Sequence, residues 1–501
     1  LVGSEMCIRD SNEVAIELIL SLTFSHSIPK NTIVFLTESD LFRRKYSSVY
    51  RALKNYSCPR DTADDQKIIL RRKERRQIIK YLTSLYTKNS RRNVYAIDTT
   101  NHYRSCASKG RDRKNVRSKN NKFSEAGYEY STLCNLKEDD WSIPINIERV
   151  GSGDNKYAIG VKQILDAHSC GEQDSVTVGI GDAAYSNCKY IEPIYNKDNL
   201  ISITRDRKNR ATYSIFSGVQ KKSGRKRHYG EKVDLLKENT QLIPHSITEF
   251  NNVSKKGRVT KVVLSEYKNL LVKGRKIHSM KEKPVNYIKV EVYDLEGNKI
   301  YKSDLLICVS GNHRNELSPR EVYDYYKSRF DIEHFFKFAK SKLRFDKFQT
   351  TDPELDEDYC MFSMIAYNHL YHLKDYASLT KEYDWYKSKG RNSTPSLVYR
   401  SISELKNKFK NITKSPKQRG IPDHRNIRKS FTKKPSTPVI SKSERNNNIE
   451  ISIKVPFGKS RKFAKTSFNA NDLDQEMLFA KISTLRDKII ANTASNVTQL
   501  E

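Results

Sequence analysis

The chain has 501 residues, more than one ordinary hydrophobic core holds, so about two or three domains are expected. Its 92 lysines and arginines outnumber its 59 aspartates and glutamates, which gives a formal net charge of +33 and favours a polyanionic partner over a merely basic surface. The longest strongly apolar run, residues 15–24, is too short to span a membrane, so no membrane partner is expected, and the 29 tyrosines and 19 phenylalanines favour nucleic acid.

The start of the chain, LVGSEMCIRDS, is unusual because it begins on Leu and resembles translated adapter sequence. Residues 1–11 are therefore interpreted as an artefact or non-native start, and the true N-terminus stays open. The eight cysteines along the chain are scattered, without a CxxC pair or a Cys/His group at zinc-ligand spacing. They suit small buried residues in a reducing cytosol.

A helical region is expected from residue 12 to about residue 90, because apolar side chains recur there at helical spacing between proline breaks. Its last helix carries a run of basic residues that includes Arg71, Arg72 and Arg75. Such a face fits DNA, and it fits a solvated helix surface nearly as well. The region is interpreted as an N-terminal DNA-binding region.

From residue 93 the pattern changes to short apolar runs rich in β-forming residues. Strands are predicted at 93–100, 128–134, 141–150, 175–182 and 199–207, with one helix at 156–168. This order is that of an RNase H-like α/β core with a mixed sheet and flanking helices. Asp98 stands near the end of the first strand and Asp182 ends the fourth, and in this fold such acids meet at one edge of the sheet.

A β-rich insertion is predicted from about residue 208 to 315, because helical periodicity is absent there and three runs alternate like strands. One long helix, from 319 to about 345, and a second, from about 359 to 376, are expected to follow. The catalytic domain would therefore occupy residues 91–375, interrupted by this insertion.

The remainder, residues 376–501, is interpreted as a helical and basic C-terminal region. Between residues 406 and 434, eleven lysines and arginines stand against one acid, which predicts a linker or a disordered basic arm. A last amphipathic helix is predicted at 472–490.

The stretch YKSRFDIEHFFKFAK in the long helix places four chemically distinct residues at helical spacing: Tyr326, Arg329, Glu333 and Lys340. Because seven residues make about two turns, they would share one face of a continuous helix. An ordinary surface helix with an Arg329–Glu333 pair explains the pattern almost as well when it is taken alone. The two strand-end acids, Asp98 and Asp182, favour a functional site instead.

With these acids, the chain resembles the DDE transposases of bacterial insertion sequences, in particular the group with a Tyr-(2)-Arg-(3)-Glu-(6)-Lys signature. The signature falls on the four residues in 326–340, and Asp182 with Tyr185 matches the family's Asp-x-x-Tyr pattern. Asp98 stands in AIDTT, where Thr99 replaces the second acid that many members carry. The resemblance covers roughly residues 90–375.

The resemblance implies three catalytic residues that also bind metal: Asp98, Asp182 and Glu333. They would be ligands of two Mg²⁺ or Mn²⁺ ions, which prefer oxygen donors and assist in-line displacement at phosphorus. It also implies that the other three signature residues, Tyr326, Arg329 and Lys340, bind DNA beside the scissile phosphate.

The expected function is that of a transposase that binds the terminal inverted repeats of its element, cleaves there and joins the ends to target DNA. The resemblance implies a homodimer on double-stranded DNA, in the bacterial cytoplasm with the nucleoid. Two alternatives stay open, an RNase H-like nuclease or resolvase and a catalytically silent DNA-binding relic of a transposase. In each case, binding to DNA is expected to weaken steeply with salt.

Overall fold

The computed structural model describes residues 2–27, 33–37, 39, 41–42, 44, 46–55, 62–87, 91–104, 110, 112–117, 124–137, 141–171, 175–207, 210–220, 222–237, 242–253, 257–274, 277–387, 393–408, 439–445, 448–457 and 462–469. For residues 2–11 and 439–469 the description is of the backbone.

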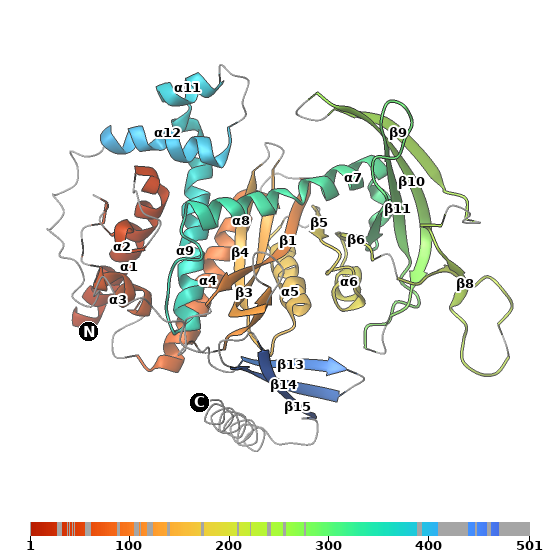
Figure 1. The fold of residues 1–501 in the computed structure, drawn as a ribbon, viewed down its shortest axis with the longest axis horizontal. Helices are drawn as coiled ribbons and strands as arrows, with labels where there is room; N and C mark the ends of the chain where they lie inside the picture. Colours follow the sequence, from red (N-terminus) through yellow and green to blue (C-terminus); the bar gives the residue numbers. More distant parts are fainter. Residues whose placement is uncertain are drawn as a thin grey trace, which may run out of the picture.

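One mixed sheet of twelve strands forms the centre of the molecule (Figure 1). Before the insertion it contains β1 (Arg92–Tyr103), β2 (Lys114–Arg117), β3 (Ser124–Leu136), β4 (Ser142–Val150), β5 (Val176–Gly181) and β6 (Leu200–Arg205). The insertion adds β7 (Thr212–Ile215), β8 (Tyr229–Val233), β9 (Ser246–Val253), β10 (Val259–Val272), β11 (Val285–Tyr293) and β12 (Leu305–Ser310). The strand order is β2-β3-β1-β5-β6-β12-β11-β10-β7-β8, with β4 on β3 and β9 on β10.

The part of the sheet around β1 has the expected RNase H-like arrangement, which confirms the α/β fold class. β1 pairs antiparallel with β3 and parallel with β5, and β5 pairs parallel with β6. The crossover between β4 and β5 contains α5 (Lys156–Ser169), whose first turn is capped by the Asn155 side chain. The short helix α6 (Cys188–Tyr195) is absent from the sequence prediction, because Pro193 interrupts its periodicity.

The insertion continues the central sheet and does not form a sheet of its own. β12 pairs antiparallel with β6 and with β11, and β10 pairs with β11, β9 and β7. The three predicted strands of the insertion correspond to β10, β11 and β12, whereas β7, β8 and β9 are additional. The chain therefore leaves the catalytic part at β6 and returns to it on the neighbouring strand.

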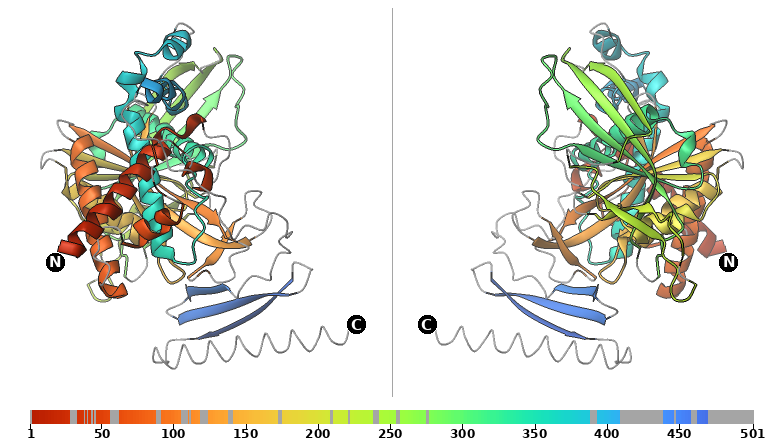
Figure 2. Two further views of the ribbon diagram at one scale, coloured as in Figure 1. Left: turned by 90° about the vertical axis from the view of Figure 1, so that its left-hand side faces the viewer. Right: turned by 90° about the vertical axis from the view of Figure 1, so that its right-hand side faces the viewer.

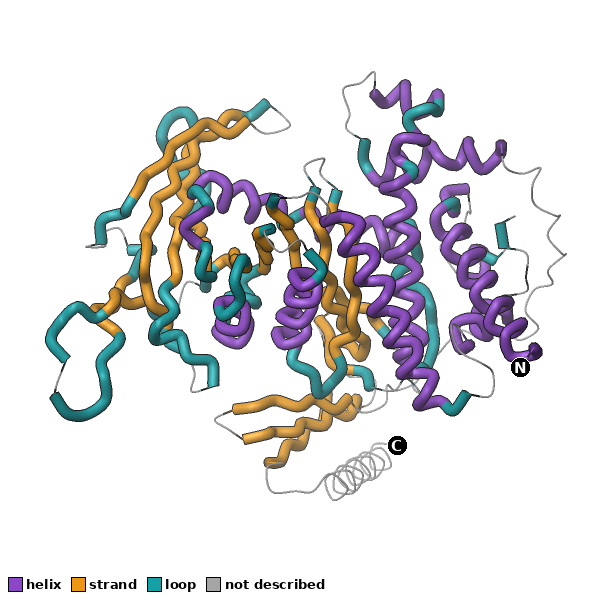
Figure 3. The backbone as a smooth tube through the Cα atoms, turned by 180° about the vertical axis from the view of Figure 1, so that it is seen from behind, coloured by secondary structure: helices purple, strands orange, loops and turns teal. Residues whose placement is uncertain are grey.

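Helices cover both faces of the sheet. Seen from behind, α5 and α6 lie in front of the strands (Figure 3), and Figure 1 shows α7 (Pro319–Ser328) and α8 (Asp331–Ser341) across the opposite face. The alternation of β5 matches these two layers: Val178 and Ile180 join the apolar cluster under α7, whereas a Cβ at Gly179 would lie 2.7 Å from Ile164 of α5. Among the helices in the described segments, none is long and apolar enough for a membrane span.

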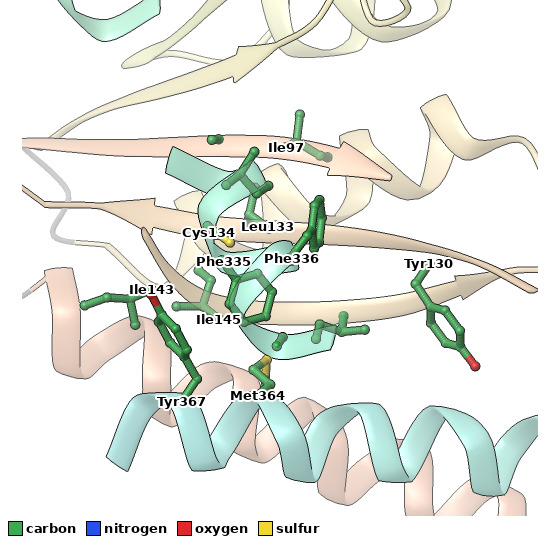
Figure 4. Packing of buried hydrophobic residues seen from close by; sticks show 14 of the residues in the cluster. Ile97, Tyr130, Leu133, Cys134, Ile143, Ile145, Phe335, Phe336, Met364 and Tyr367 are labelled. Carbon is green, nitrogen blue, oxygen red and sulfur yellow. The ribbon is translucent and has the colours of Figure 1, made fainter. Parts of the chain in front are cut away.

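The main hydrophobic core lies where α8 and α9 (Pro353–His372) meet the sheet (Figure 4). Phe335 of α8 lies among side chains of the sheet, including Ile145, and meets Tyr367 of α9 edge to face with ring centroids 5.0 Å apart. The apolar side chains that recur at helical spacing along α8, which include Ile332 and Ala339, are buried. This packing fixes α8 on the strands and, with it, the position of Glu333.

The N-terminal helices join the same core. They are α1 (Val2–Thr23), the 3-10 turn η1 (Ser25–Ser27), α2 (Ile33–Leu36), α3 (Ser47–Asn55) and α4 (Asp64–Thr87). Leu18 and Leu53 are fully buried in the cluster that also contains Phe335 and Tyr359. Helix α1 runs through residues 2–11, which the sequence analysis interprets as a non-native start.

The basic side of α4 is only partly exposed to solvent. Arg75 pairs with Glu354 at 2.8 Å and with Glu357 at 2.6 Å, and Arg71 pairs with Asp358 at 3.3 Å. Both arginines are buried, and their partners belong to α9, so the interpretation of these two as DNA-facing or solvated is wrong. The periodicity of α4 gives no hint of acids that lie 279 or more residues further along the chain.

The single long helix predicted from 319 to 345 is two helices. Around Arg329 and Phe330 the backbone forms tighter i→i+3 bonds, from the Arg329 N–H to the Tyr326 carbonyl and from the Glu333 N–H to the Phe330 carbonyl. The prediction of one continuous face is therefore wrong, because Tyr326 lies on α7, whereas Glu333 and Lys340 lie on α8. The two halves pack on different apolar clusters, which explains the break.

In the described part of the C-terminal region there are three further helices and a small sheet. The helices are α10 (Lys374–Ala377), α11 (Lys381–Lys387) and α12 (Pro395–Lys408). The strands β13 (Val439–Arg445), β14 (Asn448–Phe457) and β15 (Lys462–Asn469) form an antiparallel sheet that the sequence analysis did not predict (Figure 2). The predicted basic arm beyond residue 408 and the predicted helix at 472–490 lie outside the described residues.

Candidate active site

The register of β1 and β5 places Asp98 beside Asp182. These strands run parallel with Ile97 opposite Gly181, so the next residue on each is an aspartate. Along β5, Asp182 continues the side of Val178 and Ile180, which is the side covered by α7. The sequence prediction that these two acids meet at one edge of the sheet follows directly from this register.

A tight turn after β5 holds Asp182. The Asp182 Oδ1 accepts a hydrogen bond from the Ala184 N–H at 2.8 Å, and the Tyr185 N–H bonds to the Asp182 carbonyl at 3.1 Å. Tyr185 is fully buried and packs edge to face on Tyr157 and Tyr190. Glycine is needed before the turn, because a Cβ at Gly181 would lie 2.7 Å from the Tyr185 Cβ.

Glu333 reaches the same place from the first turn of α8. Its side chain remains 55% exposed, whereas the neighbouring Arg329 side chain is 7% exposed. Arg329 Nη1 lies 3.5 Å from Asp98 Oδ2, and Arg329 Nη2 lies 3.4 Å from Glu333 Oε1. One guanidinium therefore connects the acid of β1 to the acid of α8.

The pKa of Asp98 reflects its burial and the proximity of the other two acids. Burial and the negative charge of Asp182, with a smaller effect of Glu333, raise the pKa of Asp98 to about 6. The Thr99 N–H, which donates to Asp98 Oδ1 at 2.7 Å, and the Arg329 cation oppose this increase. The three predicted acids thus form one interacting group in the folded chain.

Tyr326 lies beside this group and at the end of a cavity. It is buried in the apolar cluster under α7, and the Arg329 guanidinium carbon lies 5.8 Å from its ring centroid. Burial raises the pKa of Tyr326, although Arg329 and Arg205 oppose the shift, so the phenol keeps its proton. The same guanidinium lies 4.6 Å from the ring centroid of Phe330, which is half exposed.

The cavity has a volume of about 650 Å³ and is lined by residues of α7 and of the insertion. Its lining combines tyrosines, a phenylalanine and several cations with one acid, Asp304. These cations include Arg205, the last residue of β6, and Lys327 of α7. Neither was predicted as a site residue, because nothing in the sequence indicates that β6 and the insertion lie beside the helix that carries Lys327.

Lys340 stands two turns after Glu333 on α8. Its Nζ donates to the carbonyl of Asn101 on β1 at 2.9 Å. This bond ties α8 to the strand that carries Asp98, three residues after that acid. Lys340 therefore contacts the strand that carries Asp98, whereas Tyr326 lines the cavity beside Arg329.

The donor set suits a divalent cation. Asp98, Asp182 and Glu333 offer carboxylate oxygens, which Mg²⁺ and Mn²⁺ prefer. Their mutual repulsion raises the pKa of Asp98, and a cation among them would relieve it. These three residues would hold such an ion.

A second group of metal-type ligands, His102, Asp356 and Cys360, lies fully buried between β1 and α9. This group could not be predicted from spacing, because Cys360 is 258 residues from His102. Both Asp356 oxygens are already engaged, Oδ1 by Arg104 at 2.9 Å and Oδ2 by the Tyr130 hydroxyl at 2.6 Å. Burial also raises the pKa of Cys360 well above its usual value, so this group is a hydrogen-bonded anchor between strand and helix.

Fold and site together define a class of enzyme. An RNase H-like sheet with neighbouring aspartates from two adjacent parallel strands and a glutamate on a following helix is the framework of DDE-type nucleic-acid processing. A family model described as "Transposase DDE domain" matches residues 89–369, more than half of the chain, and the chain belongs to this family. A search of curated proteins finds no match to the chain. Membership makes the protein a transposase in general function, with DNA as its substrate and a chemistry that uses divalent metal ions.

Proposed function

We propose that this transposase binds the terminal inverted repeats of an insertion sequence, cleaves the DNA at these ends and transfers the 3′ ends to target DNA. The observation that carries the proposal is that Asp98 and Glu333 meet at the Arg329 guanidinium while Asp182 lies beside Asp98 on the neighbouring strand. The spacing of Tyr326, Arg329, Glu333 and Lys340 supports assignment to the group with that four-residue signature.

Asp98, Asp182 and Glu333 are proposed to be the catalytic residues and the ligands of two Mg²⁺ or Mn²⁺ ions. When bound, the ions supply activation of the attacking oxygen and stabilisation of the leaving one. Asp98 lies within β1 and Asp182 directly follows β5, whereas the more exposed Glu333 completes the group from α8.

Arg329 and Lys340 are proposed to position phosphates beside the scissile one. Arg329 already spans two carboxylates with different guanidinium nitrogens, and the same fork fits a phosphate bidentately. Tyr326 stands at the cavity, where its ring and the exposed Phe330 offer apolar surfaces among cations. We propose that this cavity receives a displaced nucleotide next to the cleaved bond.

A second basic surface lies at the tip of the β7–β8 hairpin, at the edge of the sheet. Lys222, Arg225 and Lys226, named here the basic tip, are exposed, and the sequence has no acid between Asp206 and Glu231. The loop is braced, because the Gln220 side chain donates to the Arg227 carbonyl at 2.6 Å and accepts from the Arg227 N–H at 2.9 Å. We propose that the basic tip contacts DNA phosphates without regard to sequence.

The test is cleavage and strand transfer on the element's own end DNA with Mg²⁺ or Mn²⁺. Asp98→Asn, Asp182→Asn and Glu333→Gln should each lower the cleavage rate by at least about a thousandfold while DNA binding persists. Wild-type rates in all three variants would refute the assignment. General degradation without end preference or strand transfer would favour a nuclease instead.

The active form on DNA is proposed to be a homodimer that holds two ends together. Mixing the protein with two end fragments of different length should give a complex that contains both fragments and two protein chains. Multi-angle light scattering of that complex would show a single protein chain if this proposal is wrong.

A further inference from the structure

Asp206 is a buried acid on the far side of the Asp182 turn from the carboxylate cluster. It directly follows β6 and is 5% exposed. Its Oδ1 accepts hydrogen bonds from the Ser186 hydroxyl at 2.8 Å and from the Arg207 N–H at 2.7 Å, and it lies 3.4 Å from Arg210 Nη1. A buried carboxylate with this many donors stabilises the local structure, because each donor would lose its partner if the carboxylate were removed.

The donors to Asp206 also hold the turn that carries Asp182. Arg210 Nη1 donates to the Ser186 carbonyl at 3.1 Å and to the Ser186 hydroxyl at 2.7 Å. Arg207 Nε donates to the carbonyl of Ala183, the residue after Asp182, at 3.1 Å. The end of β6 therefore holds the turn at two positions, one on each side of its centre.

The other oxygen of Asp206 connects this turn to the insertion. Its Oδ2 accepts from the hydroxyl of Tyr287, which lies on β11, at 2.5 Å. Burial, together with the nearby Cys308 and Asp206, raises the pKa of Tyr287 well above its usual value, so the phenol stays protonated and donates. The insertion thus reaches the catalytic turn through the Tyr287 hydroxyl as well as through Arg210, which stands at the start of the insertion.

We propose that Asp206 is a positioning residue for Asp182, and that Tyr287 makes the geometry of the Asp182 turn depend on the insertion. Asp206 does not act on the substrate itself; it keeps Ser186 and Ala183 in place, and so keeps the Asp182 carboxylate aimed at Asp98. This inference rests on the proposed role of Asp182 as a metal ligand. Loss of a residue that orients a ligand typically weakens metal binding by about 10- to 100-fold.

The experiment measures Mn²⁺ binding to the full chain by electron paramagnetic resonance, without DNA, beside single-turnover cleavage. Asp206→Ala should weaken Mn²⁺ binding by at least about tenfold, and Tyr287→Phe by a smaller factor of about threefold. Asp206→Asn keeps the shape and an acceptor for Ser186, so it should restore part of the loss. In an Asp182→Asn background, Asp206→Asn should have no further effect on Mn²⁺ binding.

Glu266→Ala is the matched control, because Glu266 is an equally buried acid of the insertion that bonds to Ser246 at 2.8 Å, away from the turn. It should lower the thermal unfolding midpoint without changing Mn²⁺ binding. If Asp206→Asn and Tyr287→Phe fold and bind Mn²⁺ like the wild type, or if Glu266→Ala weakens binding equally, the inference is wrong. Absence of Mn²⁺ binding in the wild type, or unchanged binding in Asp182→Asn, would instead overturn the metal site on which it rests.

Discussion

Arg329 holds Asp98 at 3.5 Å with one guanidinium nitrogen and Glu333 at 3.4 Å with another. Arg329 lies between the last residue of α7, Ser328, and the first residue of α8, Asp331. From this position its guanidinium reaches Asp98 of the sheet. The residue that separates the two helices is therefore also the residue that links the acid of the strand to the acid of the helix.

Replacing Arg329 with Ala should abolish most of the activity without unfolding the protein. The two carboxylates would lose their shared cation, and a phosphate would lose its bidentate partner, so DNA cleavage should fall by about 100-fold or more. Arg329→Lys keeps the charge but lacks the two guanidinium nitrogens that contact both carboxylates at once, so it should recover only part of this loss. Single-turnover cleavage of end DNA measures the effect. Arg320→Ala, which removes an exposed arginine of α7 paired with Asp324, should cleave normally, and equal losses in both variants would contradict the role of Arg329.

Arg75→Ala should destabilise the fold by about 3 kcal/mol, because the partly buried Glu357 loses its cation and the buried Glu354 keeps only Arg72. Arg76→Ala, on the exposed side of the same helix, should change the stability by less than about 0.5 kcal/mol. Urea unfolding of the two variants at neutral pH gives both values. Similar stabilities would mean that α4 does not depend on this ion-pair network.

Stability should decrease as the pH falls below about 6.5, in part because of His102. Burial lowers the pKa of His102 from its usual 6.5 to about 4, although Asp356 opposes the shift. The unfolded chain therefore binds this proton at a higher pH than the folded chain does, and the stability present above pH 6.5 is lost progressively down to about pH 4. The full loss is about 3 kcal/mol. His102→Gln should reduce the pH dependence of the unfolding free energy by one proton in this range, and an unchanged slope would show that His102 does not titrate as described.

Removing the three charges of the basic tip should weaken binding to duplex DNA of any sequence. Substituting Lys222, Arg225 and Lys226 with Ala should lower the slope of log K against log salt by about 2 to 3 in magnitude, since each lost phosphate contact contributes about 0.9. A control that removes three scattered exposed charges consists of Lys73→Ala, Lys197→Ala and Lys381→Ala in one chain. It loses the same net charge, so an equal change in both proteins would mean that general attraction, and no contact at the hairpin, explains the effect.

The sequence was sufficient for the catalytic half of the fold because its signals are local. Apolar runs that end in Asp98 and Asp182 predict strands, and a parallel register alone then brings these acids together. The apolar stripe of α8 likewise predicts which side faces the core. Each of these inferences requires only periodicity and the order of the elements.

The features that the sequence did not reveal depend on partners distant in the chain. Arg75 has the spacing of a surface residue, and only the approach of α9 buries it. The break at Arg329 cannot be read from the helical pattern, because it arises from two halves that pack on different clusters. The group of His102, Asp356 and Cys360 likewise exists only when α9 lies on β1.

The insertion leaves the catalytic sheet at β6 and re-enters on β12, the strand hydrogen-bonded to it. Its two points of attachment therefore lie only about one strand spacing, roughly 5 Å, apart. The segment between β6 and β12 can therefore be lengthened, shortened or exchanged without moving the strands that carry Asp98 and Asp182. A replacement segment must keep the Arg210 bonds to Ser186 and bring a hydroxyl donor to the place where Tyr287 now meets Asp206.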